Sequence, residues 1–131
     1  MIREMLVKQW LKRAISNLRR AEQRRKSTEI LFEDLCYDCQ QSVEKSLKAL
    51  IIHNEMEIVF THSISRLLEI IASKGIEIPE DIQRAVILTD YAVNTRYPGD
   101  YDEVEESEFE EALAIAKNVL GWVQNHIVNI S

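Results

Sequence analysis

The scarcity of glycine and proline is the feature of this sequence that most restricts its fold. The 131 residues contain three glycines and two prolines, whereas these two residue types together normally make up about 12% of a protein. A β-sandwich or β-barrel needs turn-forming residues every 8–12 positions or so, which this chain cannot supply. Apolar residues at 46% and charged residues at 29% are typical of a globular protein. We therefore expect a few long helices in a single domain that spans residues 1–131.

The sequence shows no sign of a membrane span or of a disulfide framework. It has no run of 18 apolar residues, and its first residues are charged where a secretory signal would be apolar. Two cysteines are too few to staple a fold. These observations predict a cytoplasmic protein with no membrane contact.

Apolar residues recur at intervals of three and four in five segments, and each stripe predicts an amphipathic helix. The stripes are Val7, Leu11, Ala14, Leu18 and Ala21 in residues 2–25; Phe32, Cys36, Cys39, Val43, Leu47, Leu50 and Ile51 up to about residue 53; Ile64, Leu67, Leu68 and Ile71 in a helix that starts near Thr61; Ile82, Ala85, Val86, Thr89, Ala92 and Val93 between Pro79 and Pro98; and Phe109, Ala112, Leu113, Ala116, Val119, Leu120, Val123 and Ile127 in the last helix.

Polar residues between these segments suggest where the helices begin and end. Residues 26–28 offer N-cap candidates for the second helix, and Ser107 with Glu110 forms a capping-box pattern for the last. Gly75 suits a left-handed residue just after the third helix. Short connections between helices favour an antiparallel arrangement. We expect an all-α fold, an antiparallel up-and-down four-helix bundle with one additional short helical segment.

Two familiar chemical motifs have ordinary explanations here. Cys36 and Cys39 are spaced like a redox or zinc pair, but both fall in mid-helix on the apolar stripe and no second cysteine pair exists. We interpret them as buried small hydrophobic residues. Asp100 and Asp102 resemble a metal-binding pair but follow no strand, so a solvated acidic loop explains them better. The three histidines lack the spacing of a helix-borne metal pair. We expect neither a metal nor a cofactor.

A polar face on the second helix is more informative. Gln41, Glu44, Lys45 and Lys48 lie at i, i+3, i+4 and i+7 and therefore share one side of the helix. One interpretation is that Glu44 and Lys48 form an i, i+4 ion pair. The other is that the amide and ammonium groups of this face bind an anion such as a nucleotide phosphate.

A second informative stretch follows the fourth helix. Arg96 stands at the expected helix end, directly before Tyr97 and Pro98, where a guanidinium is well placed to bind a phosphate. Tyr97 and Tyr101 are close enough in sequence for an aromatic ring to stack on a base. Pairing of Arg96 with the nearby acidic loop is the alternative.

Four blocks of the sequence, in order, resemble the HEPN domain family, and together they cover nearly the whole chain. The blocks are Trp10 with Ala14, Leu18 and Ala21; residues 39–50, a Gln-Gln, Glu-Lys, Leu-Lys-Ala run; Thr61-His62-Ser63-Ile64 with Leu67-Leu68; and residues 88–91 followed by Thr95-Arg96-Tyr97-Pro98.

The resemblance implies a helical homodimer that binds nucleotides and works with a minimal nucleotidyltransferase partner, as in toxin–antitoxin systems. Other members of the family are metal-independent ribonuclease toxins that use an arginine followed, after four to six intervening residues, by a histidine. Arg96 matches the arginine, but positions 101–103 hold Tyr101, Asp102 and Glu103. This departure favours a non-catalytic module over the alternative, a ribonuclease that uses Arg96 assisted by Tyr101.

The net charge of −6 conceals two opposite parts. Residues 1–26 contain nine basic and two acidic residues, whereas residues 27–131 contain seven basic and twenty acidic ones. The first helix thus carries a basic face, with Lys8, Lys12 and Arg19, that is able to meet RNA phosphates or an acidic protein. A protein partner or a second subunit is the favoured interpretation.

Overall fold

The computed structural model describes residues 1–24, 26–92 and 103–128 of the chain. Within these ranges all regular structure is helical, which confirms the predicted all-α class. None of the described helices is long and apolar enough to cross a membrane. The elements in chain order are α1 (Ile2–Glu22), α2 (Phe32–His53), α3 (Ile64–Ala72), α4 (Glu80–Gln83), the 3-10 helix η1 (Arg84–Ala92) and α5 (Glu106–Val128).

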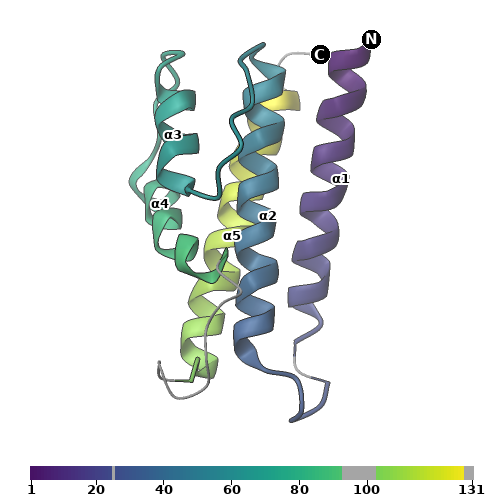
Figure 1. Cartoon of the computed structure of the whole chain (residues 1–131), viewed down its shortest axis with the longest axis vertical. Helices are drawn as coiled ribbons and strands as arrows, with labels where there is room; N and C mark the ends of the chain where they lie inside the picture. Colours follow the sequence, from purple (N-terminus) through teal and green to yellow (C-terminus); the bar gives the residue numbers. More distant parts are fainter. Residues whose placement is uncertain (25, 93–102, 129–131) are drawn as a thin grey trace.

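Helix α2 occupies the middle of the bundle and packs against α1, α3, η1 and α5. In Figure 1 the chain descends through α1, ascends through α2, descends along α4 and η1, and ascends through α5. Helix α3 is the additional short helix beside this set. The fold is thus an up-and-down bundle of four helical segments, as the sequence predicts: α1, α2, α4 with η1, and α5. Its core lies around α2.

The apolar stripes of α1, α2, α3 and α5 form the core largely as predicted. On α1 and α3 every predicted stripe residue is buried except Leu11, which packs partly buried against the core. On α2 the stripe is buried from Cys36 to Ile51, with Phe32 stacked on Phe109 of α5 at 5.8 Å between ring centroids. Burial of these stripes, rather than helix propensity alone, holds the bundle together.

The fourth helix differs from its prediction because its pitch changes. After one α-helical turn at α4, the chain continues as the 3-10 helix η1, which has three residues per turn. Buried residues therefore recur every three positions from α4 into η1, at Ile82, Ala85 and Leu88. Val86, predicted to face inward on an α-helical period, is instead 39% exposed. Val93 lies outside the described residues.

Two predicted helix starts are wrong. Helix α2 begins at Phe32 with Leu31 at the N-cap, well after residues 26–28, where Ser27 Oγ instead accepts a hydrogen bond from the backbone N–H of Glu29 at 3.1 Å. Helix α5 begins at Glu106, so Ser107 lies inside the helix and is not its cap. The N-cap of α2 makes no side-chain hydrogen bond to the helix.

The ends of α3 follow the predicted chemistry with small shifts. Ser63, not Thr61, is the N-cap, and its hydroxyl accepts from the backbone N–H of Arg66 at 3.2 Å. Thr61 Oγ1 accepts from the backbone N–H of Ser63 at 3.0 Å and so shapes the approach to the helix. Gly75 has the left-handed conformation expected of it, with a φ of 87°.

Candidate functional site

A buried carboxylate, Glu44, is the centre of a polar network on α2. Its residue is 3% exposed, and Lys48 Nζ donates to Oε1 at 2.7 Å while Gln40 Nε2 donates to Oε2 at 2.8 Å. Gln41 Nε2 donates to the Gln40 side-chain oxygen at 2.7 Å and lies 3.5 Å from Glu44 Oε2. His62, from the segment before α3, places Nδ1 3.2 Å from both carboxylate oxygens. We call these five residues the Glu44 network.

The network keeps Glu44 ionised. Burial alone would raise the pKa of this carboxyl, but the hydrogen bonds from Lys48, Gln40 and His62 and the charge of Lys48 outweigh it and hold the pKa below its ordinary value. The Lys48 ammonium is also 5.5 Å from the centre of the Trp10 ring on α1. A cation between a carboxylate and an aromatic face is held in place from two sides.

A second polar cluster lines the seam between α1 and α2. Asn17 Nδ2 donates to Asp38 Oδ1 at 3.0 Å, and Lys45 Nζ donates to Asn17 Oδ1 at 2.8 Å. Arg20 Nε lies 3.5 Å from Asp38 Oδ2. Further along the seam, Ser42 Oγ donates to the backbone oxygen of Ala14 at 2.8 Å. We call this set of contacts the α1–α2 seam.

The seam is a place where positive charges converge. Burial lowers the pKa of Lys45, and the charges of Arg13 and Arg20 act in the same direction, against Glu44 and Asp38. Lys8, Lys12 and Arg13 are exposed on α1 and form no ion pair with any described residue. An anion that approached the seam would therefore relieve a local excess of positive charge.

The structure places the predicted binding residues of α2 together but turns most of their donors inward. The predicted i, i+4 ion pair of Glu44 and Lys48 is present. Gln41 and Lys48 donate within the Glu44 network, whereas Lys45 faces the seam and is half-buried. The other predicted site residues, Arg96, Tyr97 and Tyr101, lie outside the described residues.

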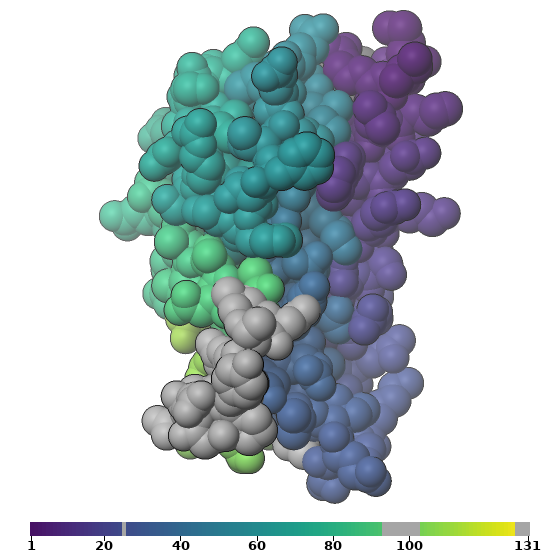
Figure 2. All heavy atoms as spheres, viewed as in Figure 1, coloured from purple at the N-terminus to yellow at the C-terminus, as the bar shows by residue number. Residues whose placement is uncertain are grey.

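His62 is a candidate that sequence reasoning did not assign to the site. It follows Glu44 by 18 positions and lies outside α2, so no helical spacing links the two. The segment between α2 and α3 lies on the front face of the molecule and brings His62 back to α2 (Figures 1 and 2). The signal available in the sequence was the Thr61-His62 start of the third helix, a polar pair just before a strongly apolar stripe.

The two cysteines and the other two histidines belong to neither polar cluster. Cys36 and Cys39 form no disulfide and have no exposed surface, and burial raises the pKa of Cys39 well above its ordinary value, so the prediction that both are buried core residues is confirmed. Burial and the charge of Arg3 lower the pKa of His53. His126 packs edge-on against Trp122 at 4.8 Å. No group of three or more potential metal ligands occurs in the described ranges.

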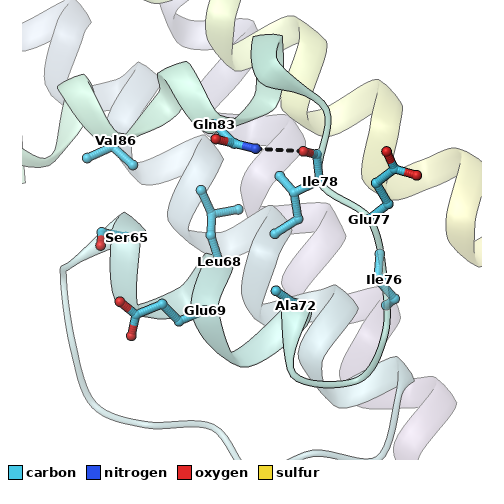
Figure 3. Close-up of a pocket in the computed structure, with 9 residues that line it drawn as sticks. All are labelled: Ser65, Leu68, Glu69, Ala72, Ile76, Glu77, Ile78, Gln83 and Val86. Atoms are coloured by element: carbon cyan, nitrogen blue, oxygen red, sulfur yellow. Dashed lines mark hydrogen bonds between the residues drawn. The ribbon is translucent and has the colours of Figure 1, made fainter.

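An open groove lies apart from both polar clusters, between α3 and α4 at the opposite edge of the molecule from α1 (Figures 1 and 3). Its floor is aliphatic and includes Leu68, Ile78 and Val86, and its rim carries Glu69 and Glu77. Across its end, Gln83 Nε2 donates to the backbone oxygen of Ile78 at 2.9 Å. The groove holds none of the predicted site residues.

Comparison with known proteins identifies relatives of this arrangement. The sequence model of the family described as HEPN domain matches residues 7–126. The crystal structure of an archaeal HEPN homologue shares 30% sequence identity with this chain and superposes with a TM-score of 0.72, over 92% of this chain and 97% of that one. No curated protein matches the sequence.

Proposed function

Because the chain belongs to the HEPN domain family, we propose that it is a nucleotide-binding and interaction module that forms a homodimer and works with a minimal nucleotidyltransferase partner. The name of the family and the expected arrangement of its members in toxin–antitoxin systems support this assignment. The module has no catalytic activity of its own, since Arg96 lacks the histidine that accompanies it in ribonuclease members of the family.

The observation that carries the proposal is the convergence of cationic side chains at the α1–α2 seam. Lys45, Arg13 and Arg20 come from two helices and lie close enough for their charges to interact. Asp38 balances only part of this charge and is bonded to Asn17 as well as paired with Arg20. A nucleotide phosphate supplies the missing negative charge and accepts hydrogen bonds from guanidinium and ammonium groups. Arg96 and Tyr97 extend the same proposal to the phosphate and base of the ligand.

Calorimetric titration with ATP, GTP and a short single-stranded RNA tests the ligand part of this proposal. We expect binding by the wild type and at least about tenfold weaker binding by Lys45→Ala and Arg96→Ala, the loss that follows from removing one charged hydrogen bond to phosphate. Lys117→Ala is the matched control, because Lys117 is an exposed lysine of α5 that pairs with Glu22 at 3.5 Å. Absence of heat with all three ligands would remove nucleotide binding and leave only the partner role.

The partner part is tested by copurification. Three exposed cations of α1 that form no ion pair with a described residue, Lys8, Lys12 and Arg13, fit an acidic protein surface. We expect a nucleotidyltransferase encoded beside this chain to copurify with it and to be released when the three residues are changed to glutamate. Copurification that survives this change would place the partner on another face.

One observation favours the ribonuclease alternative. His62 is an exposed imidazole held by a buried carboxylate, which is the usual arrangement of a proton-transfer histidine. Cleavage of RNA in the presence of EDTA, lost in both His62→Gln and Arg96→Ala, would establish the nuclease. Intact RNA after incubation with the wild type would reject it.

A further inference from the structure

His62 is anchored at one ring nitrogen and open to solvent elsewhere. Its side chain is 72% exposed, whereas the side chain of its partner Glu44 is 4% exposed. Nδ1 lies equally close, at 3.2 Å, to the two oxygens of the carboxylate. No described residue forms a hydrogen bond with the other ring nitrogen, Nε2. The imidazole is therefore oriented by the protein while Nε2 remains available.

The carboxylate determines which nitrogen carries the proton. The pKa of Glu44 is below its ordinary value, so the group is ionised near neutral pH and can only accept hydrogen bonds. Nδ1 must then donate, and the neutral ring presents a bare Nε2 acceptor to solvent. When the ring takes up a second proton, Nε2 becomes an N–H donor that points away from Glu44.

The neighbouring hydrogen-bond donors of α2 are already used within the Glu44 network and do not compete with His62 for an anion. Lys48, Gln40 and Gln41 all direct hydrogen atoms at Glu44 or at one another. An anion on this face thus meets His62 as its donor, not the amide and ammonium groups of α2. Because Lys48 neutralises Glu44, protonation of His62 gives the network a net charge of about +1, which favours an anion.

An exposed aromatic ring stands two residues before this imidazole. Phe60 is fully exposed, at 102%, on the segment that carries His62. The Cα atoms of residues i and i+2 are at most about 7 Å apart, a distance that a nucleotide can bridge between base and phosphate. Bases stack favourably on exposed aromatic rings, with little dependence on base identity.

We propose that His62 and Phe60 form a proton-linked phosphoryl-binding site, in which the Nε2–H of the His62 imidazolium donates to a phosphate oxygen and Phe60 stacks on the base. Glu44 is the positioning residue. The proposal rests on the nucleotide-binding function proposed above and adds a contact, made by His62, that is not part of the α1–α2 seam. The phosphoryl group is that of a free nucleotide or of an RNA backbone.

Binding at this site takes up protons. A phosphate favours the imidazolium over the neutral ring, so affinity decreases as pH rises. His62 contacts Glu44, which is paired with Lys48 on α2, and Glu57 on the connecting segment and Arg66 on α3 are the charged residues near it in sequence. Arg66 is paired with Glu69 at 3.5 Å, and Lys48 stays bonded to Glu44.

Calorimetry of the full-length protein with ATP and with a short single-stranded RNA, at pH 6 and pH 8, tests the proposal. We expect tighter binding at pH 6 and a binding enthalpy that depends on the ionisation enthalpy of the buffer. His62→Gln should weaken binding about tenfold at pH 6 and abolish the difference between the two pH values. His126→Gln, which changes a histidine of α5 that is packed on Trp122, is the matched control and should behave as the wild type. Far-UV circular dichroism verifies that both variants are folded.

The outcomes separate this site from the function on which it rests. Tighter binding of ATP than of RNA assigns the site to free nucleotides, and the reverse assigns it to RNA. Binding by His62→Gln with the affinity and pH dependence of the wild type overturns the site but leaves nucleotide binding intact. A wild-type protein that binds neither probe at either pH overturns both. Phe60→Ala gives a second measure, an expected loss of about fivefold or more at both pH values.

Discussion

Removing the ammonium of Lys48 while keeping its apolar stem should strongly destabilise the fold. The side chain of Glu44 is 4% exposed, and Lys48→Met removes the ion-pair partner of its carboxylate on α2. At the observed N–O distance of 2.7 Å, the lost attraction is about 6 kcal/mol for an effective dielectric constant of about 20. Part of this is recovered because Gln40 and His62 still donate and the fold relaxes. We therefore expect the free energy of unfolding to fall by about 3–5 kcal/mol at pH 7.

The double variant Glu44→Gln/Lys48→Met discriminates between loss of a charge and loss of packing. It removes both charges and keeps the volumes, so most of the stability should return, because a buried pair replaced by neutral isosteres is often harmless. Urea unfolding followed at 222 nm, at one fixed protein concentration, gives the free energies of unfolding of the wild type, Lys48→Met and the double variant. Lys45→Met is the matched control, with an expected loss of about 1 kcal/mol, since Lys45 is half-buried and bonded to neutral Asn17.

The pH dependence supplies an independent test of the same reasoning. In the wild type the lowered pKa of Glu44 contributes stability that is present above the ordinary carboxyl range and lost as pH falls through the folded-state pKa. In Lys48→Met burial acts on Glu44 without the ammonium and raises its pKa, so protonation relieves the penalty. The difference in free energy of unfolding between the wild type and Lys48→Met should therefore become smaller as the pH falls from 7 to 5. A loss below 1 kcal/mol at pH 7, or a deficit independent of pH, would refute the account of Glu44 as an ionised buried group.

Three further predictions follow from local features. Gly75→Ala should lower the free energy of unfolding by about 1 kcal/mol, and Gly121→Ala should raise it by a similar amount. A Cβ meets nothing within 4 Å at either site, but only Gly75 has a positive φ. Urea unfolding of the two variants measures these opposite effects. Neither thiol should react with Ellman's reagent in the native state, since Cys36 and Cys39 have no exposed surface, and both should react in 8 M urea; fast native reaction would contradict their burial. If the proposed homodimer joins the basic face of α1 to acidic residues of a second subunit, sedimentation in 1 M NaCl should show weaker association than in 0.1 M, and a salt-independent constant would argue for an apolar interface.

The long helices could be predicted from the sequence because one period describes each of them. Every residue of the α3 stripe is buried, and on α2 the stripe from Cys36 to Ile51 faces the core as expected. The prediction failed where the period changed. Residues 82 and 85, one turn apart, fit both a three-residue and a 3.6-residue repeat, and only the burial of Leu88 with the exposure of Val86 separates the two. Helix starts without a side-chain cap, such as Leu31 before α2, leave no signal that sequence reasoning can use.

The candidate site was partly predictable for a related reason. Contacts within α2, such as Glu44 with Lys48, follow from i, i+4 spacing and were anticipated. Contacts between elements were not, since nothing in the spacing of Asn17 and Lys45, or of Glu44 and His62, indicates that they meet. The direction of the α2 donors was equally hidden. The spacing of polar residues along a helix is the same whether their side chains point to solvent or to a carboxylate buried among them.

This last point changes what the Gln-Gln, Glu-Lys, Leu-Lys-Ala block of residues 39–50 means. Leu47, Ala49 and Leu50 of the block are core residues with no exposed surface, while its glutamines and Lys48 donate within the Glu44 network. The block that makes the resemblance recognisable therefore describes how α2 is held inside the bundle. Within it, Lys45 is the cation directed to the α1–α2 seam, and outside it His62 uses the network as a support. Ligand specificity should accordingly vary with Lys45, His62 and Phe60 while stability varies with Glu44 and Lys48, a separation that the two sets of variants measure directly.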